Sequence, residues 1–298
     1  MRVALGSAAT DPAAVFHQVG VMPRTLYLGT PQSIQNTGQS RPILFQLQDD
    51  HGAAGLWIVK AQCNSFFGCK MILAELVGAD LCAWFGLNTP EVGLLRFDTS
   101  PRPTDTTAEG RAAARIYETD AGKLAFCSRY INVPHVVEDC LSLGKRRSPS
   151  IVADGVRLLL FDATSWHYDR TMKSPNAMLV RRRIVPFDHE RAFYDIDAPA
   201  EDGCSRDYTA NIGEEAVLRH IAAGLAAKNQ DSPEWDRFVE RLNDLTDSVV
   251  DTIAQRLPDE LDAGKGGSWK RDLKRFIARR RECVLNTVGE VRRVLSKR

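Results

Sequence analysis

The sequence predicts an α+β fold with two lobes, a β-rich N-terminal part followed by a helical C-terminal part. Runs of β-branched and aromatic residues between polar turns dominate up to about residue 130. Apolar residues at helical spacing dominate from about residue 134 onward. No internal repeat interrupts this order, and 298 residues with 44% hydrophobic content can bury a sizeable core. Strands followed by helices are typical of an α+β plan.

The N-terminal part combines short strands with one apolar helix. Two of its strands flank the polar segment 49–52, which is a hairpin signature. Its helix carries apolar residues at helical spacing, and Gly86 follows as a stop signal. In chain order we predict strands at 25–28, 43–47 and 56–60, a helix at 69–85, a strand at 92–97, an exposed loop at 100–108 and a short strand or connector at 124–131.

The C-terminal part is mainly helical. Its first helix is mostly apolar, two short strands then flank a basic turn, and the last helices are amphipathic. We predict helices at 152–165, 214–227, 234–257 and 268–295, and strands at 177–180 and 183–187. The expected domains are an N-terminal extension at 1–21, an N-lobe at 22–127 and a C-lobe at 128–298.

Composition excludes some classes of protein. The net charge of +1 gives no global attraction to nucleic acid or to a membrane surface. No apolar run approaches the ~20 residues that span a bilayer, and the first 20 residues do not resemble a signal peptide. The seven cysteines form no C-x-x-C pair, so we expect reduced thiols and a cytoplasmic protein.

Two charges interrupt apolar segments of the N-terminal part. Lys60 ends the run Leu-Trp-Ile-Val, and Glu75 lies within the apolar stripe of the first predicted helix. Each charge costs free energy in such a context unless it has a partner. A strand lysine and a helix glutamate form the ion pair that positions ATP phosphates in kinases. The alternatives are an edge-strand lysine and a glutamate that both reach water.

Three polar residues of the C-terminal part follow apolar elements. Asp169 and Asn176 lie on one loop after the apolar helix predicted at 152–165. Asp188 directly follows the apolar strand predicted at 183–187. An aspartate in such a loop can orient a hydroxyl nucleophile, and amide and carboxylate oxygens are ligands that Mg²⁺ prefers. The alternative for any one aspartate is a turn residue or a helix cap.

These residues lie in stretches that resemble the HipA-like kinases, a family distantly similar to phosphatidylinositol and protein kinases. The resemblance covers about residues 36–194. The matching stretches are 57–60, 74–76, 85–91, 161–162, 168–171, 175–180 and 186–193, which include Tyr168-Asp169-Arg170-Thr171, Pro175-Asn176-Ala177 and Pro186-Phe187-Asp188-His189-Glu190.

The resemblance implies a protein-kinase-like fold, ATP and Mg²⁺ as ligands, and a role for each matching residue. Asp169 is then the catalytic-loop aspartate, Asn176 and Asp188 hold Mg²⁺, and Lys60 contacts phosphates with support from Glu75. A loop with Gly38 covers the phosphates, and its Ser40 resembles a serine that such kinases phosphorylate to silence themselves. The hinge on the adenine side is formed by Phe126, Cys127 and Ser128.

The sequence departs from the family pattern at four points, one of which is Ser165-Trp166-His167 in place of the usual small and polar lead-in. The interval from Asp169 to Asn176 is two residues longer than in the best-known members, although one branch resembles it. Thr171 stands where many members have histidine, and the phosphate loop has a single glycine, Gly38. These departures concern the geometry of two loops more than the metal ligands.

The acceptor and the partners stay open at this point. The resemblance favours a protein Ser or Thr as acceptor and leaves room for a regulatory partner protein. The alternatives are a lipid or small-molecule kinase, or a catalytically weak ATP-binding regulatory module. Residues 270–298 hold eleven basic against three acidic residues, and 231–262 hold ten acidic against three basic. We expect these charges to face each other or solvent rather than nucleic acid.

Overall fold

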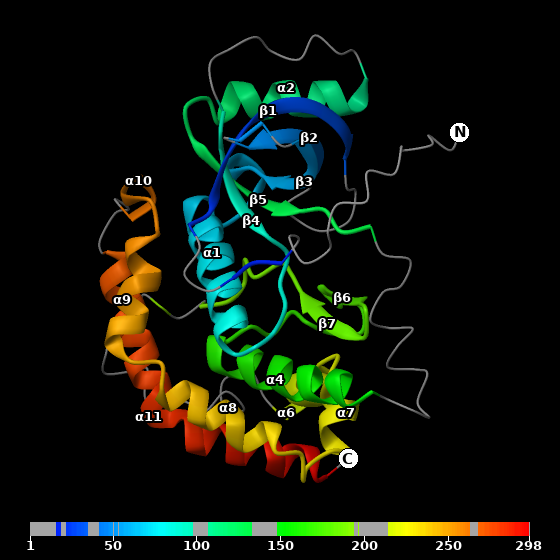
Figure 1. Ribbon diagram of the computed structural model, residues 1–298, viewed down its shortest axis with the longest axis vertical. Coiled ribbons are helices and arrows are strands. Elements are labelled where there is room, and N and C mark those ends of the chain that lie inside the picture. The colour runs from blue at the N-terminus through cyan, green and yellow to red at the C-terminus, as the bar shows by residue number, and fades with distance from the viewer. Residues whose placement is uncertain are drawn as a thin grey trace.

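A computed structural model describes residues 16–18, 22–34, 42–49, 51–52, 54–97, 107–132, 148–193, 196, 214–262 and 268–297. Helices and strands are both present, with the strands concentrated in the N-terminal part (Figure 1). The loop with Gly38 and Ser40, most of the extension at 1–21, and residues 100–106 of the predicted exposed loop lie outside the described residues.

Five strands form a small closed barrel in the order β1-β2-β3-β5-β4. All neighbouring pairs are antiparallel except β1 with β4, which is parallel. Alternate side chains point into the barrel, where Phe45, Leu47, Trp57 and Val59 are buried. The strands are β1 (Arg24–Ile34), β2 (Ile43–Asp49), β3 (Ala54–Lys60), β4 (Val92–Arg96) and β5 (Leu124–Arg129).

Helix α1 (Cys69–Trp84) joins the barrel to the helical part. It is buried from Met71 to Cys82, since it contacts β5 on one side and α4, α9 and α10 on others. Figure 1 shows it beside the barrel and above the C-terminal helices. A short 3-10 helix, η2 (Gln62–Asn64), connects β3 to this helix. Lys60 and Glu75 are therefore 15 residues apart, each on a buried part of its own element.

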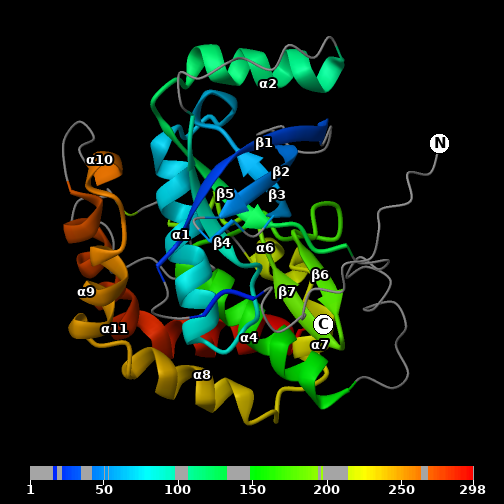
Figure 2. The same ribbon diagram turned by 45° about the horizontal axis from the view of Figure 1, so that its top comes forward.

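Helix α2 (Ala108–Thr119) is absent from the sequence prediction. Its side chains Ala113, Ile116 and Tyr117 pack against the barrel, at the i, i+3, i+4 spacing of one helix face. Thr107 begins the helix, because its Oγ1 accepts a hydrogen bond of 3.0 Å from the Gly110 N–H. Figure 2 shows α2 lying across the far end of the barrel.

The helical part is built on α4 (Pro149–Ser165), whose C-terminal half is fully buried. The two strands predicted around the basic turn are β6 (Ala177–Val180) and β7 (Arg183–Pro186), and their hairpin packs on α4. The remaining helices are α6 (Glu214–Arg219), α7 (Ala223–Ala227), α8 (Glu234–Asn243), α9 (Asp247–Gln255), α10 (Asp259–Asp262) and α11 (Trp269–Leu295).

Two long helices of the prediction are each divided in the structure. The segment 214–227 breaks at His220, which forms a β-bridge with Thr171, and the next N–H, of Ile221, donates to the Arg170 carbonyl. The segment 234–257 breaks at 244–246, between α8 and α9. Tertiary hydrogen bonds compete with helix continuation at the first break, and periodicity alone does not reveal them.

The basic helix α11 packs along the acidic segment, as one of the sequence alternatives expected. Ion pairs join Lys270 to Asp259 at 2.5 Å, Arg281 to Asp247 at 2.5 Å, and Lys274 to Asp251. Among the described residues, no helix is both long and apolar enough to cross a membrane. The five cysteines in the described ranges are free thiols.

Candidate functional site

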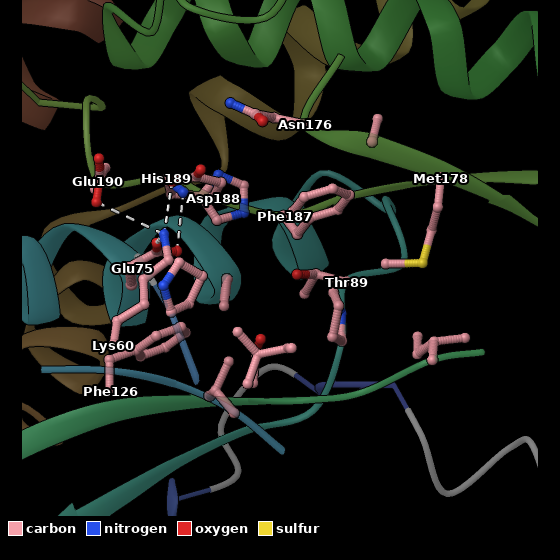
Figure 3. A pocket seen from close by; sticks show the side chains of 18 of the residues that line it. Lys60, Glu75, Thr89, Phe126, Asn176, Met178, Phe187, Asp188, His189 and Glu190 are labelled. Atoms are coloured by element: carbon pink, nitrogen blue, oxygen red, sulfur yellow. Dashed lines mark hydrogen bonds and ion pairs between the residues drawn. The ribbon is translucent and has the colours of Figure 1, made fainter. Parts of the chain in front are cut away.

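A cavity of about 860 Å³ lies between the barrel and the β6–β7 hairpin. Its lining comes from β3, α1, β4, β5, the loop before β6 and the segment after β7 (Figure 3). Of the sequence-predicted site residues, the cavity is lined by Lys60, Glu75, Phe126, Ser128, Asp169, Asn176 and Asp188. Segments more than 100 residues apart in the sequence therefore meet in one hollow of a size typical of small-molecule sites.

Lys60 and Glu75 form a buried ion pair in this cavity. The Lys60 ammonium donates to Glu75 Oε1 at 2.5 Å, and the relative exposures of the two residues are 5% and 1%. Burial raises the pKa of Glu75 to about 7 against the opposing effect of Lys60. Burial also acts to lower the pKa of Lys60, but Asp188 and Glu75 outweigh it and raise that pKa. The lysine is therefore a permanent cation in the cavity wall.

Asp188 meets the same ammonium from the end of β7. Its Oδ1 accepts a hydrogen bond from Lys60 Nζ at 2.6 Å. Burial acts to raise its pKa, but the charge of Lys60 prevails and lowers it, so the carboxylate is ionised. Its φ of +60° lies in the left-handed region, which non-glycine residues adopt rarely. Such conformations cluster at functional sites, where the surrounding contacts enforce them.

The backbone after Asp188 is anchored to α1. The His189 N–H donates to Glu75 Oε2 at 2.8 Å, so Glu75 holds both Lys60 and the segment that carries Asp188. Gly78 permits this close approach, since a Cβ there would lie 2.5 Å from the His189 Cβ. Burial and the charge of Arg170 lower the pKa of His189 well below its usual range, which keeps its ring neutral.

Asp169 and Asn176 lie on the loop between α4 and β6. The Asp169 side chain is 36% exposed and pairs with Arg191 Nε at 3.5 Å. Burial raises its pKa above the ordinary value, with Arg191 opposing. The Asn176 Oδ1 accepts a hydrogen bond from Ser174 at 3.4 Å, and its φ is +41°. Both side chains face the cavity and remain accessible to a ligand.

Arg170 holds the loop between α4 and β6 in place through buried contacts. It is fully buried, and its Nε donates to Asp162 Oδ2 at 2.8 Å. Its Nη1 donates to the carbonyls of Asn176 and Phe187, the latter at 2.9 Å. One guanidinium thus holds the residue before β6 and the residue before Asp188. The segments that carry the two expected metal ligands are locked to each other.

Two histidines complete the buried network. His220 Nε2 donates to Asp162 Oδ2 at 2.7 Å, because its Nδ1 already accepts from the Ala222 N–H. His167 Nε2 donates to the Asp188 carbonyl at 3.1 Å. Burial and the neighbouring Arg170 lower the pKa of His167 to about 4, so its ring is neutral.

Of the three residues predicted to form the hinge, Phe126 and Ser128 line the cavity and Cys127 does not. Cys127 does not line the cavity, because side chains alternate along β5 and its thiol points into the barrel core. The cavity lining continues instead through Arg129, Tyr130 and Ile131. The expected lobe boundary at 127/128 also falls inside β5, which ends at Arg129. The alternation of the strand could have identified Cys127 as a core residue.

Sequence reasoning assigned no role to Glu190, Arg191 or Lys173, which also line the cavity. Apolar surface in the cavity comes from Ile58, Val92, Met178 and Phe187, and Figure 3 shows Met178 on the opposite side of the cavity from Glu190. The arrangement offers a fixed ammonium for an anion, oxygen ligands for a hard cation, and an apolar wall for a flat ring.

No family model matches the chain, and no curated protein matches it.

Proposed function

We propose that this chain binds ATP together with Mg²⁺ and transfers the γ-phosphate to a hydroxyl group, as the resemblance to HipA-like kinases implies. One observation carries the proposal. The Lys60 ammonium, paired with both Glu75 and Asp188, shares a single cavity with Asp169 and Asn176. Phosphoryl transfer depends mainly on positioning and on charge stabilisation, and this cavity contains the groups for both.

The donor set fits the metal that the reaction requires. Asn176 and Asp188 contribute an amide and an ionised carboxylate oxygen to the cavity, and Mg²⁺ prefers such hard ligands. Bound Mg²⁺ would neutralise charge on the phosphates. The Lys60 ammonium would bind phosphate oxygens, and Ile58, Val92 and Met178 offer apolar surface to the base.

Asp169 is the residue that we assign to the acceptor. Its accessible carboxylate would accept the hydrogen bond of the incoming hydroxyl and align its oxygen with the γ-phosphorus. The new bond joins that oxygen to phosphorus, the bond to the β-phosphate oxygen breaks, and ADP leaves with the electron pair. The hydroxyl proton passes to Asp169 or to solvent.

The test is incubation with γ-labelled ATP and Mg²⁺, first of the protein alone and then with a cell extract. The products are separated into protein, lipid and small-molecule fractions. We expect label on protein Ser or Thr. Label only in lipid or in a small molecule would move the acceptor to that class. If no fraction carries label while ATP still binds, the chain is an ATP-binding module and not a kinase.

A further inference from the structure

Glu190 is a buried acid of the cavity that the proposed reaction does not use. Its side chain is 10% exposed and points toward Lys60 (Figure 3). Its Oε2 lies 3.7 Å from the Lys60 ammonium, beyond hydrogen-bond distance. This oxygen accepts no hydrogen bond from any described residue. Buried polar atoms nearly always have a hydrogen-bond partner, so this oxygen points to a ligand that the described residues do not supply.

The surroundings of Glu190 indicate that the partner is a cation. Oxygens of Glu75, Asp188 and Glu190 all lie within 4.8 Å of one another. Lys60 donates hydrogen bonds to Glu75 and Asp188 but not to Glu190. One ammonium can balance the charge of only one of these three carboxylates, so a divalent cation would stabilise the ionised forms of the other two.

The spacing also suits a divalent ion. Two oxygens that bind one Ca²⁺ at 2.3–2.6 Å can lie up to about 5 Å apart, and for Mg²⁺ the limit is about 4 Å. The cluster is therefore already close to the span of a cation site. The Asp188 side chain is 27% exposed, so an ion can reach it from the cavity while Lys60 keeps its contact with the more deeply buried Glu75.

We propose that Asp188 and Glu190 together form a divalent-cation site that fills in the absence of nucleotide. This inference deepens the proposed function, on which its catalytic use rests. The site differs from the Asn176–Asp188 pair because its second ligand is Glu190. A cation bound here before ATP would replace Lys60 as the partner of Asp188. The Lys60 ammonium would then be available to bind phosphate.

The experiment is a titration of the nucleotide-free protein with Mn²⁺, followed by the electron paramagnetic resonance signal of the free ion. Glu190→Gln removes the charge and keeps the shape of the side chain, and Glu190→Ser serves as a second variant. Glu215→Gln, at an exposed pair with Arg219 on α6, is the matched control. Circular dichroism and thermal unfolding check the fold of every variant.

We expect the parent and Glu215→Gln to bind Mn²⁺ alike, and Glu190→Gln to bind it at least ~10-fold more weakly, since even outer-shell changes cost ~10–100-fold. Mn²⁺ should raise the unfolding temperature of the parent more than that of Glu190→Gln. Equal affinity of parent and both Glu190 variants, or no binding by the parent, would overturn the inference and leave Glu190 as a protonated acid.

The experiments distinguish failure of the proposed cation site from failure of the proposed kinase activity. Binding of Mn²⁺ through Glu190 in a protein that neither binds nor consumes ATP would support the cation site and refute the kinase. Phosphate transfer by a parent whose Mn²⁺ affinity does not depend on Glu190 would support the kinase and refute the cation site.

Discussion

Lys60 Nζ lies 2.6 Å from Asp188 Oδ1, although 128 residues separate the two in the sequence. The same ammonium lies 2.5 Å from Glu75 Oε1. The contact joins the last residue of β3 to the segment after β7, at the wall of the cavity. The barrel and the helical part are thus connected through charges at the site where we place the phosphates.

Lys60 and Glu75 should act as one unit. Lys60→Met and Glu75→Gln are each expected to impair phosphate transfer, since the first leaves Glu75 buried without its cation and the second leaves Lys60 held by Asp188 alone. The double variant should cost less than the sum by about 0.5–3 kcal/mol, because contacting residues are not additive. The measurement is a double-mutant cycle on kcat/KM with ATP. Strict additivity would mean that the pair does not operate together during turnover.

Asp169 should affect transfer much more than nucleotide binding. Asp169→Ala is expected to keep ATP affinity within a few-fold and to lower transfer by at least ~100-fold, the lower range for a positioned acid–base group. Calorimetry gives the affinity and a label-transfer assay gives the rate. The exposed Asp236 on α8 supplies the control variant Asp236→Ala, which should match the parent. A parallel fall in affinity and rate would assign Asp169 to binding or folding.

Arg170 should be among the most important residues for stability. Arg170→Leu leaves Asp162 as a buried charge without its guanidinium partner, which typically costs about 3–5 kcal/mol. The exposed pair of Arg219 with Glu215 is the control, and Arg219→Leu should cost about 0.3–0.5 kcal/mol. Urea denaturation gives both free energies of unfolding. Similar values for the two variants would contradict the role of Arg170 as the link beneath the loop.

The stability of the protein should fall below pH 6.5, in part through His167. Burial and Arg170 lower the pKa of this ring from 6.5 to about 4 in the folded state. Stability from the neutral ring is thus present above pH 6.5 and is lost as pH falls through 4. A shift of this size corresponds to ~3 kcal/mol.

The measurement is urea denaturation at several values between pH 7 and pH 4. His167→Gln removes the titrating ring, so the variant should lose less free energy of unfolding than the parent over this range. His51→Gln, at an exposed position, should follow the parent. An unchanged pH profile in His167→Gln would show that the ring does not limit acid stability.

The sequence indicated the parts of the site that depend on local pattern. A charge within an apolar stripe predicted the contact between Lys60 and Glu75, and the structure contains it. Strand and helix periodicity predicted β2, β3, α1, α4 and α11 to within a few residues. These signals depend only on residues that are close in the sequence, so a single sequence contains them.

Other features depend on tertiary contacts that no local pattern carries. The helix break at His220 follows from its bridge to Thr171 and from the Ile221 bond to Arg170. Glu190 follows an aspartate and a histidine in a polar segment, so the sequence gives no sign that its carboxylate is buried beside Lys60. Helix α2, in contrast, has an apolar face at helical spacing that the sequence does carry, directly after a polar, proline-containing segment.

We place the transfer of the ATP γ-phosphate in the cavity around Asp188. The most direct test is the rate of label transfer from γ-labelled ATP with Mg²⁺ by the parent and by Asp188→Asn, with Asp236→Asn as the control. The substitution removes a charged metal ligand and leaves phosphate charge uncompensated. We expect transfer by the parent and by Asp236→Asn, and none above background by a folded Asp188→Asn protein. A near-parental rate in Asp188→Asn would contradict this assignment.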